Sequence, residues 1–336
     1  MGKLPCNRED EQVEPMVLGE FDLIHSFFSS LGCVRNDVSL GIGDDCALLN
    51  LPEGMQLAAT MDTLVAGVHF FPDVAPETLG HKALAVNLSD LAAMGAKPAW
   101  ISLALTLPKA DPDWLRAFSR GMGRLASRHE VQLIGGDTTQ GPLSVTIQAL
   151  GLLPRGSEMR RSGARVGDWI CVTGTLGDAG LALHGLHRGQ PVSPALIQRL
   201  ERPEPRVEAG LALRELANSA IDISDGLLAD LGHVLQASGV GGEVRLQSIP
   251  LSDQVREVVG REQDWSIPLA SGDDYELCVT LPPQQAAQVE VVSQALHLPI
   301  TRIGEIVDEA GLRCRLDDGT LWSPSKSGYN HFLSHA

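Results

Sequence analysis

Carboxylate side chains recur at the ends of apolar segments in this sequence, and this pattern is typical of a binding site for divalent cations. Asp44 and Asp45 follow one apolar segment, and Asp62 follows a second one. The other acidic ends are Asp90, Asp137, Asp222 and Asp225. Carboxylates that meet in space repel one another and require cations, and a site made only of oxygen ligands favours Mg²⁺ or Mn²⁺ over zinc. The sequence therefore predicts that these aspartates converge on a magnesium-binding pocket.

Glycines stand beside several of these aspartates. Gly41-Ile42-Gly43 lacks the third glycine and the following helix of a dinucleotide-binding fingerprint, and the lack of a Gly-Lys-Ser/Thr segment excludes a P-loop. A plain Gly-Asp turn is the ordinary interpretation of one such motif. Several such motifs in one chain favour instead a backbone that approaches a ligand closely.

The segment from Asp222 to Gly226 ends an apolar strand and begins a helix. Ser224 or Asp225 is therefore expected to cap the helix N-terminus, where free amide groups can also bind phosphate oxygens. A cap does not explain Asp222, which shares a strand face with Ser224. That face is expected to be polar at the end of the strand.

Arg161 and His69 are candidates for phosphate and substrate binding. Arg161 lies in a segment that is ordinarily a solvated linker, but beside an acidic metal site an arginine can bind phosphate through two hydrogen bonds. His69, taken alone, is more often structural than catalytic. The sequence contains no nucleophile elbow and no H-E-x-x-H motif. An acceptor that is already a phosphate is largely dianionic at neutral pH and needs no general base, so the protein would mainly position two anions and offset their charge with Mg²⁺.

The overall composition is that of an acidic globular protein. The chain has 336 residues, 43% of them hydrophobic, and a formal net charge of −16. This length favours two domains, and the negative charge argues against nucleic acid as a partner. No apolar segment reaches the length of about 18 residues that spans a bilayer, and the N-terminus lacks a signal-peptide core, so no membrane association and a cytoplasmic location are expected. The six cysteines include no C-x-x-C pair, which fits reduced thiols.

Helices and strands alternate on both sides of one irregular segment. Apolar spacing and terminal signals predict helices over 21–31, 76–95, 111–128, 179–186, 205–217 and 227–237. Strands are predicted over 100–107, 131–134, 143–153, 169–172, 220–223, 243–246, 275–281, 300–307 and 312–316. The Gly- and Arg-rich segment 154–167 breaks the pattern and is the best domain boundary. We therefore predict a flexible extension over 1–18, an N-terminal domain over 19–153 and a C-terminal α/β domain over 154–336.

Several ordered blocks of sequence resemble the bacterial thiamine-monophosphate kinase family. The resemblance extends from about Gly19 to Phe332, and long ordered blocks are far more specific than a single Gly-Asp pair. The blocks are 41–49 (GIGDDCALL), 62–70 (DTLVAGVHF), 82–96 (KALAVNLSDLAAMGA), 135–139 (GGDTT), 224–227 (SDGL) and 274–277 (DYEL).

The resemblance implies a mixed α/β, two-domain fold shared with aminoimidazole ribonucleotide synthetase. It also implies a homodimer in which N-terminal strands of both subunits form a barrel. The implied activity is ATP-dependent phosphorylation of thiamine monophosphate to thiamine diphosphate. The N-terminal domain would then bind ATP and Mg²⁺ and mediate dimerisation, and the C-terminal domain would complete the site.

The resemblance also implies roles for individual residues. Positions that match Mg²⁺ ligands of the family, for several ions, are Asp45, Thr60, Met61, Asp62, Asp90, Asp137, Asp222 and Asp225. Positions that match ATP contacts are Gly136, Asp137, Arg161 and Ser224. Positions that match thiamine monophosphate contacts are His69, Asp273 and Tyr329. The expected catalytic residues are Asp45, Asp137, Arg161 and Asp225.

Two positions depart from the family pattern. Met61 stands where threonine is usual, so a metal contact there could use only the main chain. Asp273 replaces a glutamate and reaches less far by one methylene. Because thiamine carries a permanent positive charge, the carboxylate of Asp273 and the aromatic face of Tyr329 or Trp322 would favour its binding. The ordinary alternative for Tyr329 is a C-terminal anchor in the core.

Two other functions compete with the kinase interpretation. The first is another ATP-using synthetase of the same fold, which activates an amide or a selenide. A synthetase that activates selenide would require a reactive cysteine in a glycine-rich segment that also contains a lysine. Cys6 does not lie in such a segment. The second is a non-catalytic protein that binds divalent cations.

Overall fold

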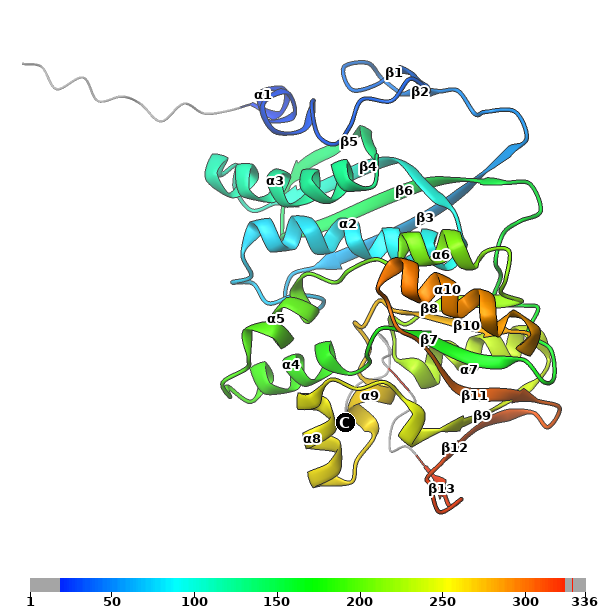
Figure 1. Cartoon of the computed structure of the whole chain (residues 1–336). Coiled ribbons are helices and arrows are strands. Elements are labelled where there is room, and N and C mark those ends of the chain that lie inside the picture. The colour runs from blue at the N-terminus through cyan, green and yellow to red at the C-terminus, as the bar shows by residue number, and fades with distance from the viewer. Residues whose placement is uncertain (1–18, 324–327, 329–336) are drawn as a thin grey trace, which may run out of the picture.

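The computed structural model of the chain describes residues 19–323 and residue 328. The predicted extension 1–18 and Tyr329 lie outside the described residues. Within the described part, an N-terminal sheet and a C-terminal sheet each carry helices, and α2 and α6 lie in the region between the sheets (Figure 1). This arrangement is a mixed α/β, two-domain fold, as predicted. None of the described helices has the length and apolar character needed to cross a membrane.

The N-terminal sheet positions the first half of the site. Its strands, in spatial order, are β3 (Met55–Val65), β6 (Ser144–Pro154), β4 (Lys97–Leu107) and β5 (Gln132–Gln140). β6 is antiparallel to both of its neighbours, whereas β4 and β5 are parallel. Helices α2 (Pro76–Ala93) and α3 (Pro112–Arg128) pack together on one face of this sheet. β3 and β5 are therefore its two edges.

The opposite face of this sheet is only partly covered by the chain itself. Leu57 and Met61 of β3 are 41% and 59% exposed on this face. Near its β5 side, the segment 38–49, which contains β1 (Val38–Leu40) and β2 (Leu48–Leu49), packs against Trp100 and Leu152. An apolar area thus remains open beside the β3 edge.

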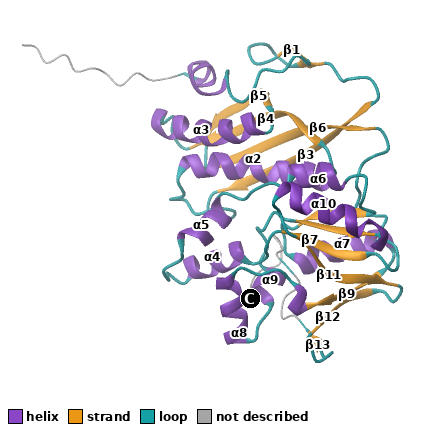
Figure 2. Cartoon of the chain, in the orientation of Figure 1, coloured by secondary structure: helices purple, strands orange, loops and turns teal. Residues whose placement is uncertain are grey.

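The C-terminal sheet lies between helices on both of its faces (Figure 2). Its order is β13 (Leu321–Trp322), β12 (Gly311–Arg315), β9 (Gly241–Arg245), β11 (Ile300–Val307), β7 (Trp169–Thr173), β10 (Leu277–Leu281) and β8 (Ser219–Asp222). Helices α6 (Val207–Leu213) and α10 (Ala286–Leu296) join a core shared with the N-terminal domain, and α7 (Leu227–Ser238) packs in a second core. Further helices are α4 (Asp178–His187), α5 (Pro194–Glu201), α8 (Asp253–Glu262) and α9 (Ser266–Ala270). β8 is an edge strand that contacts α2, so it delivers Asp222 to the boundary between the domains.

Some predicted helices differ from the observed ones. In place of one helix over 21–31, the chain forms α1 (Glu20–Leu23) followed by a π-helical turn, η1 (Ile24–Phe28). The predicted helix over 205–217 is shortened to α6. The sequence did not predict α5, α8, α9 or α10, each of which buries only one or two residues. In α10, for example, Val289 is the buried residue.

Candidate active site

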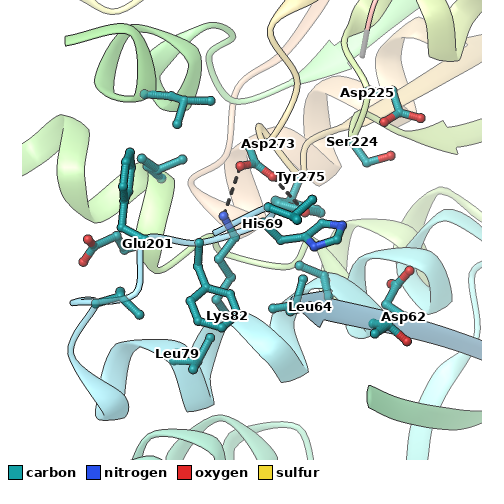
Figure 3. A pocket seen from close by; sticks show the side chains of 18 of the residues that line it. Asp62, Leu64, His69, Leu79, Lys82, Glu201, Ser224, Asp225, Asp273 and Tyr275 are labelled. Atoms are coloured by element: carbon teal, nitrogen blue, oxygen red, sulfur yellow. Dashed lines mark hydrogen bonds and ion pairs between the residues drawn. The ribbon is translucent and has the colours of Figure 1, made fainter. Parts of the chain in front are cut away.

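A pocket of about 440 Å³ lies between the two domains and contains several of the predicted site residues. Its acidic end is lined by the predicted metal ligands Asp62, Asp90, Asp222 and Asp225. The predicted ligand contacts His69, Ser224 and Asp273 also line it. Figure 3 shows Asp62 and Asp225 at one side of the pocket, Glu201 at the other, and Lys82, Asp273, Tyr275 and His69 between them.

Helix α2 holds two of the four aspartates in place. Thr60 on β3 donates its hydroxyl hydrogen to Oδ2 of Asp90 on α2. One residue earlier on α2, the Ser89 hydroxyl donates to Oδ2 of Asp222 at 2.8 Å. Asp62 lies two residues from Thr60 on the same strand face, which the alternation of β3 turns toward α2. The acidic end thus depends on two sheets and one helix that meet at the domain boundary.

Burial and mutual repulsion make these carboxylates difficult to ionise. Burial raises the pKa of Asp62 to about 6, and the charges of Asp90 and Asp225 add to this effect. The pKa of the buried Asp222 lies well above its ordinary value, mainly because of burial and then because of the charge of Asp90. Burial also raises the pKa of Asp90. Carboxylates in this situation gain from a nearby cation.

The donor set fits Mg²⁺ but does not form a closed cage. Among the described residues, no three His, Cys, Asp and Glu side chains are close enough to hold a metal ion by themselves. Mg²⁺ commonly takes one or two carboxylates and completes its shell with water and substrate phosphates. The four aspartates therefore match a metal that shares its ligands with a phosphate-bearing substrate.

The turn that presents Ser224 and Asp225 is built differently from the prediction. Neither residue caps α7, because the N-cap is Gly226, whose φ of 106° favours glycine. Instead, Oδ2 of Asp230 accepts the backbone N–H groups of Ser224 and Asp225 at 3.0 and 3.1 Å. Burial and the charge of Asp225 raise the pKa of Asp230 to about 7. Sequence analysis missed Asp230 because its role depends on a hydrogen bond back to residues that precede the helix.

The middle of the pocket is crossed by an ion pair. Nζ of Lys82, on α2, lies 3.0 Å from Oδ2 of Asp273. The hydroxyl of Tyr275 donates to Oδ1 of Asp273 at 3.0 Å. Asp273 has a positive φ of 61°, a conformation that aspartate adopts more readily than most residues. The shorter side chain at this position therefore suits its backbone.

His69 has a defined hydrogen-bonding direction. Its Nδ1 accepts the backbone N–H of Val65 at 3.0 Å. In the neutral ring the proton must then lie on Nε2. His69 can thus present a donor to a phosphate or a hydroxyl group in the pocket.

Comparison with known proteins identifies the family. Residues 43–153 match the model of the AIR synthase related protein N-terminal domain, and residues 165–317 match that of its C-terminal domain. A thiamine-monophosphate kinase of Escherichia coli K12 is 49% identical over 324 residues, which are 95% of this chain and 100% of the relative. The one from Bacillus subtilis 168 is 36% identical over 94% of this chain and 100% of its own length. The chain belongs to the thiamine-monophosphate kinase family.

Solved structures agree with the thiamine-monophosphate kinase fold. The enzyme of that name from Stenotrophomonas maltophilia K279a has a TM-score of 0.80 and 48% identity, and the match covers 85% of this chain and 92% of that chain. AaThiL complexed with AMPPCP and TMP has a TM-score of 0.73 and 33% identity, and covers 88% of this chain and 93% of that one. The hydrogenase maturation protein HypE of E. coli has a TM-score of 0.76 at 23% identity, with coverage of 94% and 98%, and shares the fold.

Other residues that the sequence analysis predicts as ligands lie outside this pocket. Gly136 and Asp137 are on the edge strand β5, whereas Asp62 is on the opposite edge strand, β3. Asp45 is exposed in the loop between β1 and β2. Met61 is 59% exposed on the sheet face that points away from α2. The predicted ligands that belong to this sheet are therefore divided between its two opposite edges.

Arg161 lies within electrostatic range of the acidic end. Although it is exposed, its charge lowers the otherwise raised pKa of both Asp90 and Asp230. This position is compatible with the phosphate-binding role that the thiamine-monophosphate kinase resemblance implies for it.

A buried ion network behind the pocket was also missed by sequence analysis. Glu276 has a side-chain exposure of 0% and accepts hydrogen bonds from Arg199, Arg206 and Thr173. Its neighbour in the DYEL block, Asp274, accepts the backbone N–H of Gly177. This network anchors the segment that carries Asp273 and Tyr275. The DYEL block was the only feature of the sequence that pointed to this network. The spacing of a single glutamate does not show whether its side chain is buried or exposed.

Proposed function

We propose that this chain transfers the γ-phosphoryl group of ATP directly to the phosphate of thiamine monophosphate, and so produces thiamine diphosphate and ADP. The observation that carries the proposal is the pocket in which Asp62, Asp90, Asp222 and Asp225 lie beside His69 and Asp273. This arrangement suits two phosphate-bearing substrates that meet at an acidic, metal-binding end. AaThiL, at 33% identity, was solved with AMPPCP, an analogue of ATP, and with TMP, which we interpret as thiamine monophosphate.

Mg²⁺ would be held by carboxylates of the acidic end. Asp62, Asp90, Asp222 and Asp225 are the residues of this pocket that would bind it, with oxygen atoms of the substrates completing the shell. When bound, the metal reduces the charge repulsion between the two phosphate groups. Because each aspartate is fixed by β3, α2, β8 or the turn before α7, the protein supplies an ordered site for this charge.

The remaining groups bind and orient the substrates. Arg161 lies near Asp90 and Asp230 and would bind a phosphate group of ATP. His69, with its proton on Nε2, would donate to the phosphate end of thiamine monophosphate. No side chain has to remove a proton from the acceptor, because a phosphate monoester is already largely dianionic at neutral pH. We assign catalysis to positioning and charge compensation.

We further propose that the active unit is a homodimer. Asp45, Gly136 and Asp137 lie on the β5 side of the N-terminal sheet and do not line the pocket of their own chain, to which the opposite edge strand, β3, contributes Asp62. The apolar area at Leu57 and Met61 on the open face offers a contact surface for a second copy. The same residues of the second copy would then complete the ATP- and Mg²⁺-binding part of the pocket.

The proposed domain division follows from this arrangement. Residues 19–153 would form the ATP-binding and dimerisation domain, and residues 154–336 would form the domain that completes the site. We place the enzyme in the cytoplasm, where ATP is available and where the free thiols of Cys171, Cys278 and Cys314 would stay reduced.

An assay of ADP release tests the function. With thiamine monophosphate, ATP and Mg²⁺, the purified chain should release ADP and form thiamine diphosphate in equal amounts. Asp222→Asn should lower turnover by roughly 100-fold or more and raise the Mg²⁺ concentration required. Another synthetase of this fold would not form thiamine diphosphate, and a protein that only binds cations would not release ADP. Either result would contradict the proposal.

A further inference from the structure

One face of helix α2 lines the pocket from end to end. Leu79, Lys82, Val86 and Asp90 all line the pocket, and their spacing of three or four residues places them on one stripe of the helix. At a rise of 1.5 Å per residue, the stripe from Leu79 to Asp90 is about 16 Å long. The pocket is therefore an elongated trough whose two ends differ in chemistry.

The end at Leu79 is apolar. Phe71 and Val74, from the loop before α2, line this end together with Leu183 of α4 and Leu200 of α5. The Phe71 ring packs against the ring of His187, with centroids 5.3 Å apart, and so connects the loop to α4. Together, Phe71, Val74, Leu79, Leu183 and Leu200 form what we call the apolar compartment. None of its side chains would assist phosphate chemistry.

A carboxylate lies beside this compartment. Glu201, the last residue of α5, lines the pocket on the side opposite Asp62 and Asp225 (Figure 3). Among the described residues, no hydrogen bond or ion pair within 4.0 Å engages its carboxyl group. Burial raises the pKa of Glu201; the nearby charge of Lys82 lowers it, and that of Asp73 raises it further. Such a carboxyl group can exchange hydrogen bonds with a weakly basic nitrogen heterocycle.

The substrate of the proposed function has the same polarity along its length. Thiamine monophosphate carries a phosphate at one end, a cationic thiazolium ring in the middle and a flat, uncharged aminopyrimidine at the other end. We infer that it lies along α2 with its phosphate at Asp62 and Asp90, its thiazolium ring near Asp273, and its aminopyrimidine in the apolar compartment, where Glu201 binds the nitrogen edge of the ring. This inference rests on the proposed function and assigns a specificity-determining role to Glu201.

Truncation of the substrate tests this orientation. The probe is the N-methylthiazolium phosphate, which keeps the cationic ring and the phosphate but has a methyl group in place of the aminopyrimidine arm. Wild-type enzyme should use it with a kcat/KM at least roughly tenfold lower than that for thiamine monophosphate. Equal kcat/KM values for the two substrates would overturn the inference. Absence of ADP release with thiamine monophosphate would instead contradict the proposed function.

Two variants then locate the aminopyrimidine. Val74→Phe fills the apolar compartment, and Glu201→Gln removes the acid while keeping its shape. For each variant, kcat/KM for thiamine monophosphate should fall roughly tenfold more than kcat/KM for the truncated probe, mainly through KM. Equal losses on both substrates, or no loss on either, would overturn the assignment.

Matched substitutions at exposed positions serve as controls. Val291→Phe on α10 changes a residue that is 65% exposed, and Glu257→Gln on α8 changes an exposed carboxylate. Both should leave the ratio of the two kcat/KM values unchanged. If Val74→Phe does not fold, as judged by its thermal unfolding, the half-buried Glu201→Gln keeps the test decisive.

Discussion

Nζ of Lys82 lies 3.0 Å from Oδ2 of Asp273, so an ion pair joins the N-terminal helix α2 to the C-terminal segment 271–276 across the pocket. The hydroxyl of Tyr275 donates a hydrogen bond to the other carboxylate oxygen of Asp273. The negative charge that Asp273 offers to a cationic substrate is therefore shared with Lys82. The pair thus connects the two domains across the pocket.

A double-mutant cycle measures this coupling. Lys82→Met and Asp273→Asn should each lower kcat/KM for thiamine monophosphate, because each leaves a partly buried charged or polar group without its partner. The double variant should lose less than the sum of the two effects, with an interaction energy of about 1–2 kcal/mol. The exposed pair of Lys97 and Glu130 is the control. A cycle of Lys97→Met and Glu130→Gln should give an interaction energy of about 0.5 kcal/mol or less. Additive losses at Lys82 and Asp273 would show that their contact is energetically unimportant.

The stability of the metal-free protein should depend on pH. Folding raises the pKa of Asp62 to about 6 and that of Asp230 to about 7. Each group then contributes stability that is fully present below its unfolded pKa, near 4, and that is lost as the pH rises through the folded value. The Tm in EDTA should therefore fall between pH of about 4 and about 7, and Mg²⁺ should restore it at pH 7.

Substitution shows whether these two aspartates cause the effect. Asp62→Asn and Asp230→Asn should each reduce the fall in Tm between those pH values. Asp308→Asn, at an exposed position, should not change it. A metal-free Tm that is constant over this range would contradict the mutual repulsion assigned to the acidic end.

Mixed dimers test the contribution of a second copy. Asp137→Asn and Asp222→Asn chains should each be inactive alone, since every dimer of either variant lacks one part of both sites. After unfolding and refolding as an equal mixture, half of the dimers contain one chain of each kind and one intact site, so about one quarter of the wild-type activity should return. A mixture of Asp90→Asn and Asp222→Asn chains should recover none, because both lie in the same pocket. If the first mixture recovers no activity, Asp137 and Asp222 of one chain act in the same pocket, and the proposed contribution of a second copy is wrong.

The buried ion network should support stability. Glu276→Gln leaves the guanidinium groups of Arg199 and Arg206 without their shared counter-charge, and should lower the free energy of unfolding by about 3–5 kcal/mol. Urea unfolding measures this loss. Glu305→Gln, which breaks a half-exposed pair with Arg302, is the control and should cost about 1 kcal/mol or less. Losses of equal size would indicate that the network contributes nothing beyond a surface pair.

Sequence analysis predicted the fold class, and helices with strong terminal signals were predicted best. Pro76 at the start and Gly95 after the end located α2, and Asp111 located the start of α3, whose amide groups it caps. Strand limits were less accurate: the strand predicted over 131–134 extends to Gln140 in β5, because it pairs along its length with β4. Local patterns predict an element, whereas its neighbours determine where it ends.

The candidate site was predictable in composition but not in arrangement. Aspartates at the ends of apolar segments indicated an acidic metal site, and the structure places Asp62, Asp90, Asp222 and Asp225 at one pocket. The separation of Asp62 from Asp137 follows from the strand order β3, β6, β4, β5, which no local pattern determines. Lys82 and Glu201 could not be recognised either, because an isolated charged side chain is ordinarily exposed to solvent.

Because Leu79, Lys82, Val86 and Asp90 belong to a single helix, the distance from the apolar compartment to the acidic end is set by helical rise. The fixed length of α2 thus determines how long a ligand must be to contact both ends of the pocket. A shorter phosphate ester would fill one end of the trough and leave the other end to water. The enzyme can therefore select its substrate by length when the substrate binds, before any bond to phosphorus is broken.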